Sequence, residues 1–173
     1  MHASFKRHAA FTFIEVIIVV IIMAILSISM AVAFQNVQLK VRFDKNVSRI
    51  TELFQQARTL SLSTLMIDGT DPTYYYALNL GTSSVTLIAY AADTSVTQTL
   101  ETFTYDSDMY LNDLAIGIYY FPPSGEICIG AASCASGATE AEITFADRSG
   151  TYSTQFNITT AGGYVDVETT VTP

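Results

Sequence analysis

The feature that most constrains this chain is a long apolar stretch close to its N-terminus. No ionisable side chain occurs from Val16 to Leu39, and residues 10–34 carry a single charge, that of Glu15. A helix rises about 1.5 Å per residue, so roughly 20 apolar residues cross the hydrocarbon core of a bilayer. We therefore expect a membrane-spanning helix over residues 11–35.

A short basic segment precedes the apolar stretch. Lys6 and Arg7 lie among the first ten residues. Positive residues beside a membrane-spanning helix stay on the cytoplasmic side. The sequence therefore predicts that the chain starts in the cytoplasm and that everything after the helix lies outside it.

Glu15 is unusual in this setting, because a carboxylate inside an apolar helix costs about 2.5–3.5 kcal/mol on insertion scales. One interpretation is structural: near the start of a helix, the helix dipole favours a negative charge that can reach back to the headgroups. The other interpretation is functional, since an ionisable residue within a membrane helix usually marks a site.

The residues around the start of the stretch, Ala-Phe-Thr-Phe-Ile-Glu-Val at positions 10–16, closely resemble the processing site of type IV pilins and pseudopilins. The resemblance implies that a prepilin peptidase cuts between Ala10 and Phe11, methylates the new amine and leaves the helix in place, whereas a signal peptidase removes it. It also implies that Glu15 pairs with the amine of Phe11 on a neighbouring subunit, because pairing makes a buried carboxylate tolerable. Ala10 departs from the glycine usual in this family, and we expect this small residue to permit cleavage.

The same resemblance implies a function and its partners. Residues 1–10 become a leader peptide, and the chain is a structural subunit of a type IV pilus or a type II secretion pseudopilus. It waits in the inner membrane with its head outside the cytoplasm, then joins a periplasmic or cell-surface filament through its N-terminal helix. The implied partners are other pilin or pseudopilin subunits, the prepilin peptidase, an inner-membrane assembly platform and membrane lipid, with no cofactor. The alternative is a surface or tip pilin that binds a ligand, as an adhesin or a DNA-uptake receptor.

Charge is distributed unevenly over the 173 residues, whose formal net charge is −8. Five basic residues follow the apolar stretch: Lys40, Arg42, Lys45, Arg49 and Arg58. After Arg58 the sequence contains thirteen acidic residues and one basic residue, Arg148. Nucleic-acid binding depends on Lys and Arg that neutralise phosphates, so DNA is an unlikely partner for this acidic head. The basic cluster is interpreted as helix-surface charge, or as a surface that meets acidic heads of neighbouring subunits.

The helical pattern continues beyond the apolar stretch. No Gly or Pro occurs between Gln35 and Ile67, and apolar residues recur at spacings of three and four: Val47, Ile50, Phe54, Ala57 and Leu60 or Ser61. The opposite face is polar, with Lys45, Arg49, Glu52, Gln56 and Thr59. This pattern predicts an amphipathic helix over residues 36–66, packed on the head. The Asp-Gly-Thr-Asp-Pro segment at 68–72 is expected to end it.

A β domain is expected over residues 67–173. Alternating or continuous apolar patterns predict strands within 74–80, 85–91, 96–105, 115–121, 140–145, 152–158 and 165–171. In the first of these, Tyr74, Tyr76, Leu78 and Leu80 are expected to form the apolar face. About eight short strands predict an α+β fold, in which a long N-terminal helix packs on an antiparallel, β-sandwich-like head. This is the pilin fold that the resemblance implies.

Three segments resemble the GspH/FimT family of minor pilins and pseudopilins. They are the Ala-Arg pair within residues 53–65, Phe-Pro-Pro-Ser-Gly at 121–125 and Thr-Ala-Gly-Gly-Tyr-Val at 160–165. The resemblance implies a minor subunit and glycines that make turns. No helix start follows these glycines, so they do not form a phosphate-binding loop.

Two cysteines flank a short loop of small residues. Cys128 and Cys134 lie in a head that is expected outside the cytoplasm, where oxidising conditions favour disulfides. We expect a disulfide, with two free thiols as the alternative.

Both histidines, His2 and His8, lie in the expected leader. A mature chain without histidine offers no Ser/His/Asp or Cys/His relay, and it lacks the commonest ligand for a zinc ion. The sequence therefore predicts a protein that is not an enzyme.

One acidic cluster hints at calcium. Asp106, Asp108 and Asp113 form a dense acidic cluster, but it fails the EF-hand pattern, because Leu111 stands where a glycine is needed and Gly117 where the bidentate glutamate belongs. A solvated loop is the preferred interpretation, with an unusual calcium loop as the alternative. No metal site is predicted.

Overall fold

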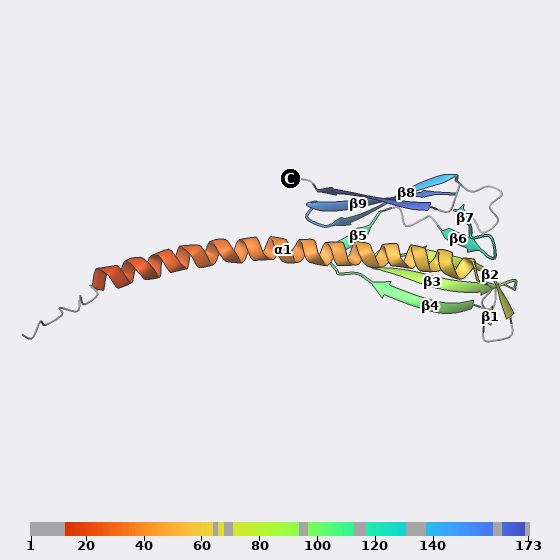
Figure 1. Cartoon of the computed structure of the whole chain (residues 1–173), viewed down its shortest axis with the longest axis horizontal. Helices are drawn as coiled ribbons and strands as arrows, with labels where there is room; N and C mark the ends of the chain where they lie inside the picture. Colours follow the sequence, from red (N-terminus) through yellow and green to blue (C-terminus); the bar gives the residue numbers. More distant parts are fainter. Residues whose placement is uncertain are drawn as a thin grey trace, which may run out of the picture. The chain divides into compact units, whose positions relative to one another are not determined.

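The computed structural model describes residues 13–63, 66–67, 71–93, 97–112, 117–130, 138–160 and 164–171 (Figure 1). The chain divides into two compact units, Met1–Val41 and Arg42–Pro173. One long apolar N-terminal helix is followed by antiparallel sheets, so the expected α+β, pilin-like architecture is confirmed.

Helix α1 spans Phe13–Ser61, and it ends before residue 66, where the pattern had predicted its end. The amide of Leu62 donates to the carbonyls of Arg58 and Thr59, and the hydroxyl of Ser61 also donates to the Arg58 carbonyl, at 2.7 Å. These bonds occupy carbonyls of the last turn, as helix ends require. Met66–Ile67 then forms the short strand β1 instead of helix.

The strands form two antiparallel sheets. The first sheet has the order β4-β3-β2-β6-β7, with β1 paired to β2, and the second has the order β10-β9-β8-β5. Besides β1, the first sheet contains β2 (Asp71–Leu80), β3 (Ser84–Ala91), β4 (Thr97–Thr104), β6 (Ile118–Phe121) and β7 (Glu126–Ile129). The second contains β5 (Met109–Leu111), β8 (Glu140–Asp147), β9 (Tyr152–Thr159) and β10 (Tyr164–Val171).

The longer strands and the four-residue strand β6 lie where the sequence predicted them, whereas β1, β5 and β7 were missed. Strands β1, β5 and β7 have two to four residues, too few for an alternation to be visible. Asp71 and Pro72, expected in a turn, begin β2, where Pro72 opposes Met66 of β1. The expected strand 115–121 is seen as Ile118–Phe121, and residues 113–116 lie outside the described part.

The core of the second unit joins one face of α1 to both sheets. Phe43 lies 5.4 Å from Phe145 of β8 between ring centroids, and Phe54 lies 5.8 Å from Phe156 of β9. The first sheet contributes Tyr76, Leu78 and Ile118, among others, to the same buried cluster. In Figure 1 the second half of α1 accordingly runs between the two sheets. The predicted apolar helix face is confirmed, since Ile50, Phe54 and Ala57 are buried.

The outer face of the first sheet differs from the predicted pattern. Tyr74, expected on the apolar face, is 55% exposed, whereas Tyr75 and Ala77 on the other face are buried. The ring of Tyr75 stacks on that of Tyr90 at 4.7 Å and meets that of Tyr119 edge-on at 5.6 Å. A register shift between Thr73 and Tyr75 accompanies this arrangement. The strand is therefore apolar on both faces, and the outer one carries an aromatic cluster.

The Phe-Pro-Pro-Ser-Gly segment forms the expected turn between β6 and β7. The amide of Gly125 donates to the Phe121 carbonyl at 2.9 Å, and Gly125 has a φ of +67°. A Cβ at this position would lie 3.0 Å from the Leu62 side chain, just past the end of α1. Glycine is therefore favoured both by its conformation and by this close approach.

One exposed edge of the second sheet is strand β10. Within it, the amide of Val167 donates to the carboxylate of the neighbouring Asp166 at 2.9 Å. One donor of the edge strand is thus occupied by a side chain of the same strand.

Candidate assembly site on helix α1

The first half of α1 presents apolar side chains in all directions. Every side chain described between Phe13 and Gln38 is exposed, including Ile22, Leu26 and Phe34. By length and composition this helix can cross a membrane, although a signal sequence near an N-terminus passes the same test. An apolar surface this large needs lipid or other protein to cover it.

Two serines interrupt the apolar surface without leaving a free donor. The hydroxyl of Ser27 donates to the Met23 carbonyl at 2.7 Å, and that of Ser29 donates to the Ile25 carbonyl at 3.1 Å. A polar group that is already hydrogen-bonded loses less free energy when it enters an apolar environment. The serines are therefore compatible with lipid or a packed helix bundle around this half.

Glu15 lies in the first turn of α1 and is exposed. The position places the carboxylate where the helix dipole favours a negative charge. Ala10 and Phe11, the expected cleavage and methylation residues, lie outside the described residues. The pairing of Glu15 with a neighbouring amine therefore stays a prediction.

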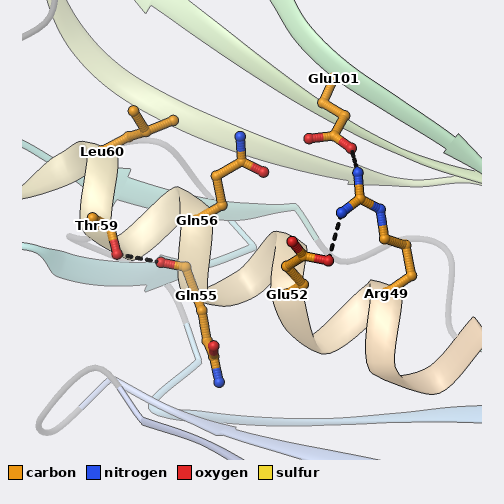
Figure 2. Close-up of a pocket in the computed structure, with 7 residues that line it drawn as sticks. All are labelled: Arg49, Glu52, Gln55, Gln56, Thr59, Leu60 and Glu101. Atoms are coloured by element: carbon orange, nitrogen blue, oxygen red, sulfur yellow. Dashed lines mark hydrogen bonds and ion pairs between the residues drawn. The ribbon is translucent and has the colours of Figure 1, made fainter. Parts of the chain in front are cut away.

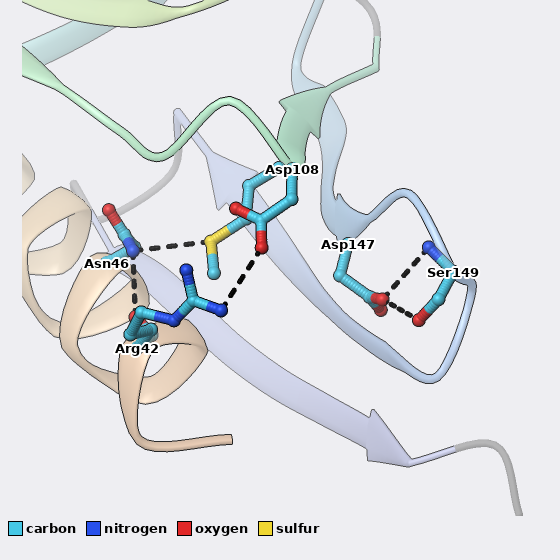
Figure 3. Close-up of polar contacts among 6 residues, drawn as sticks. Arg42, Asn46, Asp108, Asp147 and Ser149 are labelled. Carbon is cyan, nitrogen blue, oxygen red and sulfur yellow. Dashed lines mark hydrogen bonds and ion pairs between the residues drawn. The ribbon is translucent and has the colours of Figure 1, made fainter. Parts of the chain in front are cut away.

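The second half of α1 begins with a polar attachment to the segment before β5 (Figure 3). Arg42 Nη2 lies 3.5 Å from Asp108 Oδ2, and the Asn46 side-chain amide donates to the Arg42 carbonyl at 2.7 Å. The same amide contacts the sulfur of Met109, the first residue of β5, at 3.3 Å. Asn46 is buried. Position 46 lies three residues after position 43 and four before position 50, a helical spacing that could have indicated burial. An asparagine did not suggest a buried position, because its side chain is polar.

Arg49 links α1 to the first sheet (Figure 2). Its guanidinium bonds Glu52 on the helix at 2.5 Å, and it also bonds Glu101 on β4. The hydrogen bond that Arg49 donates to Glu52, together with the nearby charge of Glu101, raises the pKa of Arg49. Arg42 and Arg49, two of the five basic residues expected on the helix surface, therefore pair with acids of their own domain.

A hollow of about 420 Å³ lies beside Arg49, and Figure 2 shows the residues that line it. Polar helix residues form one wall, where the hydroxyl of Thr59 donates to the Gln55 carbonyl at 2.8 Å. Its lining contains amides, carboxylates and one guanidinium but no nucleophile beside a base: Arg49, Glu52, Gln55, Gln56, Thr59, Leu60 and Glu101. This arrangement can form hydrogen bonds with a polar group that enters the hollow.

Asp147 organises the turn between β8 and β9. Its carboxylate accepts hydrogen bonds from the amide of Tyr152 at 2.6 Å, from the amide of Ser149 at 3.0 Å and from the Ser149 hydroxyl (Figure 3). Burial alone would raise the pKa of Asp147, but these hydrogen bonds outweigh it and the pKa lies below its ordinary value. The Tyr152 ring lies 5.6 Å from that of Phe43, so the turn supports the helix contact.

The predicted acidic cluster is only partly described. Asp108 pairs with Arg42, and Asp113 lies outside the described residues. Within the described ranges, no group of three His, Cys, Asp or Glu residues could hold a metal ion.

The predicted disulfide is also only partly described. Cys128 lies in β7, opposite Tyr119 of β6, and is 2% exposed. Cys134 lies outside the described residues, so its pairing with Cys128 stays a prediction.

Comparison with known proteins bears on the N-terminal region. Residues 5–33 match the prokaryotic N-terminal methylation motif. No curated protein and no solved structure matches the chain. The matched range contains Ala10, Phe11 and Glu15, together with most of the exposed apolar half of α1.

Proposed function

We propose that this chain, whose methylation motif supports a type IV pilin-like prepilin, is a structural subunit of a type IV pilus or a type II secretion pseudopilus. The observation that carries the proposal is a coincidence of two features. The matched residues 5–33 overlap the half of α1 whose apolar side chains are exposed. That surface is covered by lipid before assembly and by the helices of other subunits afterwards.

Processing precedes assembly in this proposal. A prepilin peptidase removes residues 1–10 on the cytoplasmic side and methylates the amine of Phe11. The positive amine then meets Glu15 of a neighbouring subunit, and the low dielectric between the helices strengthens their attraction. An inner-membrane assembly platform draws the subunit from the bilayer, and the head remains outside the cytoplasm.

A minor subunit of GspH/FimT type is the finer form of the proposal. Two of the three segments that carry this resemblance, residues 53–65 and 121–125, lie close together. The turn at Gly125 approaches Leu62 just after the helix end. The third segment begins at Thr160, whose amide donates to the Thr139 carbonyl at 3.0 Å. Its glycines, at positions 162 and 163, lie outside the described residues.

Intact mass and N-terminal sequencing of the chain, extracted from membranes and from sheared filaments, test the function. We expect both fractions to begin with N-methylated Phe11 and to retain the helix. An Ala10→Gly variant should be processed in the same way, whereas Ala10→Leu should keep the leader and stay in the membrane. A native chain that keeps Met1, or one that has lost the apolar helix, would refute the proposal.

The aromatic outer face of the first sheet favours a second candidate, a pilin that binds a surface ligand. Tyr74 is 55% exposed, and its ring meets that of Phe121 edge-on at 6.0 Å. Large exposed aromatic groups are enriched where proteins meet partners. If this candidate holds, Tyr74→Ala should reduce the adhesion of cells that carry filaments without reducing the number of filaments. Unchanged adhesion would rule out this candidate function.

A further inference from the structure

Two hollows lie at opposite ends of the β8–β9 strand pair. The first, of about 480 Å³, is lined by Thr82, Tyr110, Leu111 and Arg148. Arg148 directly follows β8, and its amide donates to the Asp108 carbonyl at 2.8 Å. This end of the strand pair therefore presents a guanidinium beside an aromatic and an aliphatic side chain.

The second hollow, of about 340 Å³, lies where β8 begins and β9 ends. Its lining includes two carboxylates and one side-chain amide: Glu140, Ala141, Glu142, Asn157, Ile158 and Thr159. Glu142 is directly opposite Asn157 in the ladder, and Glu140 is opposite Thr159. The carboxylates of Glu140 and Glu142 therefore project on the same face of the sheet.

The hollows carry opposite charges that are not paired with other described residues. Arg42 and Arg49 form ion pairs with carboxylates, and among the described residues none of Arg148, Glu140 and Glu142 belongs to an ion pair. The neighbouring Asp147 does not supply the missing partner, because its carboxylate accepts the hydrogen bonds of its own turn. Arg148 and both glutamates are exposed.

The separation of the hollows prevents them from meeting within one molecule. Strand β8 has eight residues, and at about 3.3 Å per residue its two ends lie about 25 Å apart. A contact between the two charges must therefore join two copies. In a head-to-tail arrangement such a contact is heterologous, and its repetition builds an open helical array when the rotation does not close into a ring.

We propose that the two hollows are the two sides of one contact between consecutive copies of this chain. The carboxylates of Glu140 and Glu142 of one copy enter the Arg148 hollow of the next. A guanidinium matches a carboxylate bidentately, and Tyr110 lines the same hollow as Arg148. This inference rests on the proposed function in its broad form, a filament subunit whose copies follow one another, and not on the minor-subunit form. The N-terminal helices hold the heads together at a high effective concentration, so a modest contact is enough to orient them.

Charge reversal in the full-length chain, expressed in cells that assemble filaments, tests the contact. Arg148→Glu should lower the amount of this chain in sheared filaments about tenfold, as interfacial charge pairs do when one partner is reversed. A chain carrying both Glu140→Arg and Glu142→Arg should show a similar loss. Coexpression of the two chains should restore assembly, because alternating copies then join opposite charges at every contact. Glu126→Arg, an exposed reversal on β7 that lines neither hollow, is the matched control.

The outcomes separate this contact from the proposed function. If Arg148→Glu has the mature N-terminus and a wild-type unfolding temperature but assembles poorly, and coexpression rescues it, the contact is supported. Wild-type assembly by either reversed chain overturns the contact and leaves the function intact. Loss without rescue also overturns it, since the partner is then a different chain. If Arg148→Glu does not fold, two other chains replace it in the test: the double variant Glu140→Arg, Glu142→Arg and the single variant Arg148→Gln. Poor assembly by these folded and processed chains supports the contact, and wild-type assembly overturns it. A wild-type chain without a processed N-terminus refutes the function itself.

Discussion

The two halves of α1 differ in where their apolar side chains find packing partners. From Phe13 to Gln38 the described side chains are exposed and mostly apolar, whereas from Arg42 to Ser61 one face is buried and the other is polar. The second half therefore finds its apolar partners within the chain, in both sheets. The described side chains of the first half are exposed, so their apolar partners must come from lipid or from other protein molecules. A helix can thus be a core element and an assembly element without any break between the two.

The polar side chains of the two halves follow the same division. Arg42 and Arg49 in the second half have carboxylate partners from the β domain, and Asn46 contacts Met109. In the first half, Ser27 and Ser29 bond back to the helix itself. Glu15 is the one ionisable residue between Phe13 and Gln38, so the strongest test of the comparison begins there.

Replacement of Glu15 by Val should have the largest effect. The methylated amine of a neighbouring Phe11 would be left without a counter-charge between packed helices, and breaking such a buried pair costs about 3–5 kcal/mol. We expect at least about a hundredfold less of the chain in sheared filaments, with membrane levels unchanged, by quantitative immunoblotting.

The matched control for Glu15 is Glu52→Val in the other half. Glu52 is an exposed partner of Arg49, and such surface pairs contribute about 0.2–1 kcal/mol. Assembly of Glu52→Val should therefore stay near that of the wild type. If the two variants assembled equally well, Glu15 would have no special role.

Truncation of a phenylalanine should separate the two halves by folding stability. Phe43 is fully buried between Phe145 and Tyr152, so Phe43→Ala should lower the free energy of unfolding of the β domain by about 3–5 kcal/mol. Phe34→Ala removes the same group from a side chain that is 62% exposed, and it should leave that free energy within about 0.5 kcal/mol. Denaturation of the detergent-solubilised chains, followed by tyrosine fluorescence, gives both values. Similar losses would mean that Phe34 also belongs to the folded core.

Acid should lower the folding stability of the β domain that packs on the second half of α1, and this is the smallest of the expected effects. The pKa of Asp147 in the folded chain lies below its ordinary value of 3.8. The stabilisation from its hydrogen bonds is therefore complete above about pH 3.8 and is lost as the pH falls through the lower folded value. Thermal unfolding between pH 5 and pH 2 should show this loss, and Asp147→Asn should reduce the pH dependence in that range. An unaltered pH dependence in Asp147→Asn would assign the effect to other carboxylates.

The features that could be predicted from sequence are those carried by long, regular patterns. The charge-free stretch from Val16 to Leu39 and the three-and-four spacing of Ile50, Phe54 and Ala57 each involve many residues under one constraint. The longer strands are visible for the same reason. Of the candidate site, the position of Glu15 in the first turn of α1 agreed with its predicted place near the helix start.

The features that escaped prediction depend on contacts between distant residues. The bond between Arg42 and Asp108 joins α1 to the segment before β5, and no local pattern connects them. Tyr75 and Ala77 were left off the expected apolar face, because alternation cannot show that the ring of Tyr75 packs against those of Tyr90 and Tyr119. The helix ended earlier than expected because hydroxyl groups compete for carbonyls in its last turn, an effect that the absence of Gly and Pro conceals.

The hydrogen bond between Val167 and Asp166 has a consequence for crowded copies. An edge strand with free amides is a template on which another strand can grow, and unplanned growth of that kind leads to fibrils. In β10, Asp166 occupies one such amide and adds negative charge beside Glu168. Concentrated copies are thereby discouraged from joining edge to edge, and the ordered route through the apolar helix meets less competition.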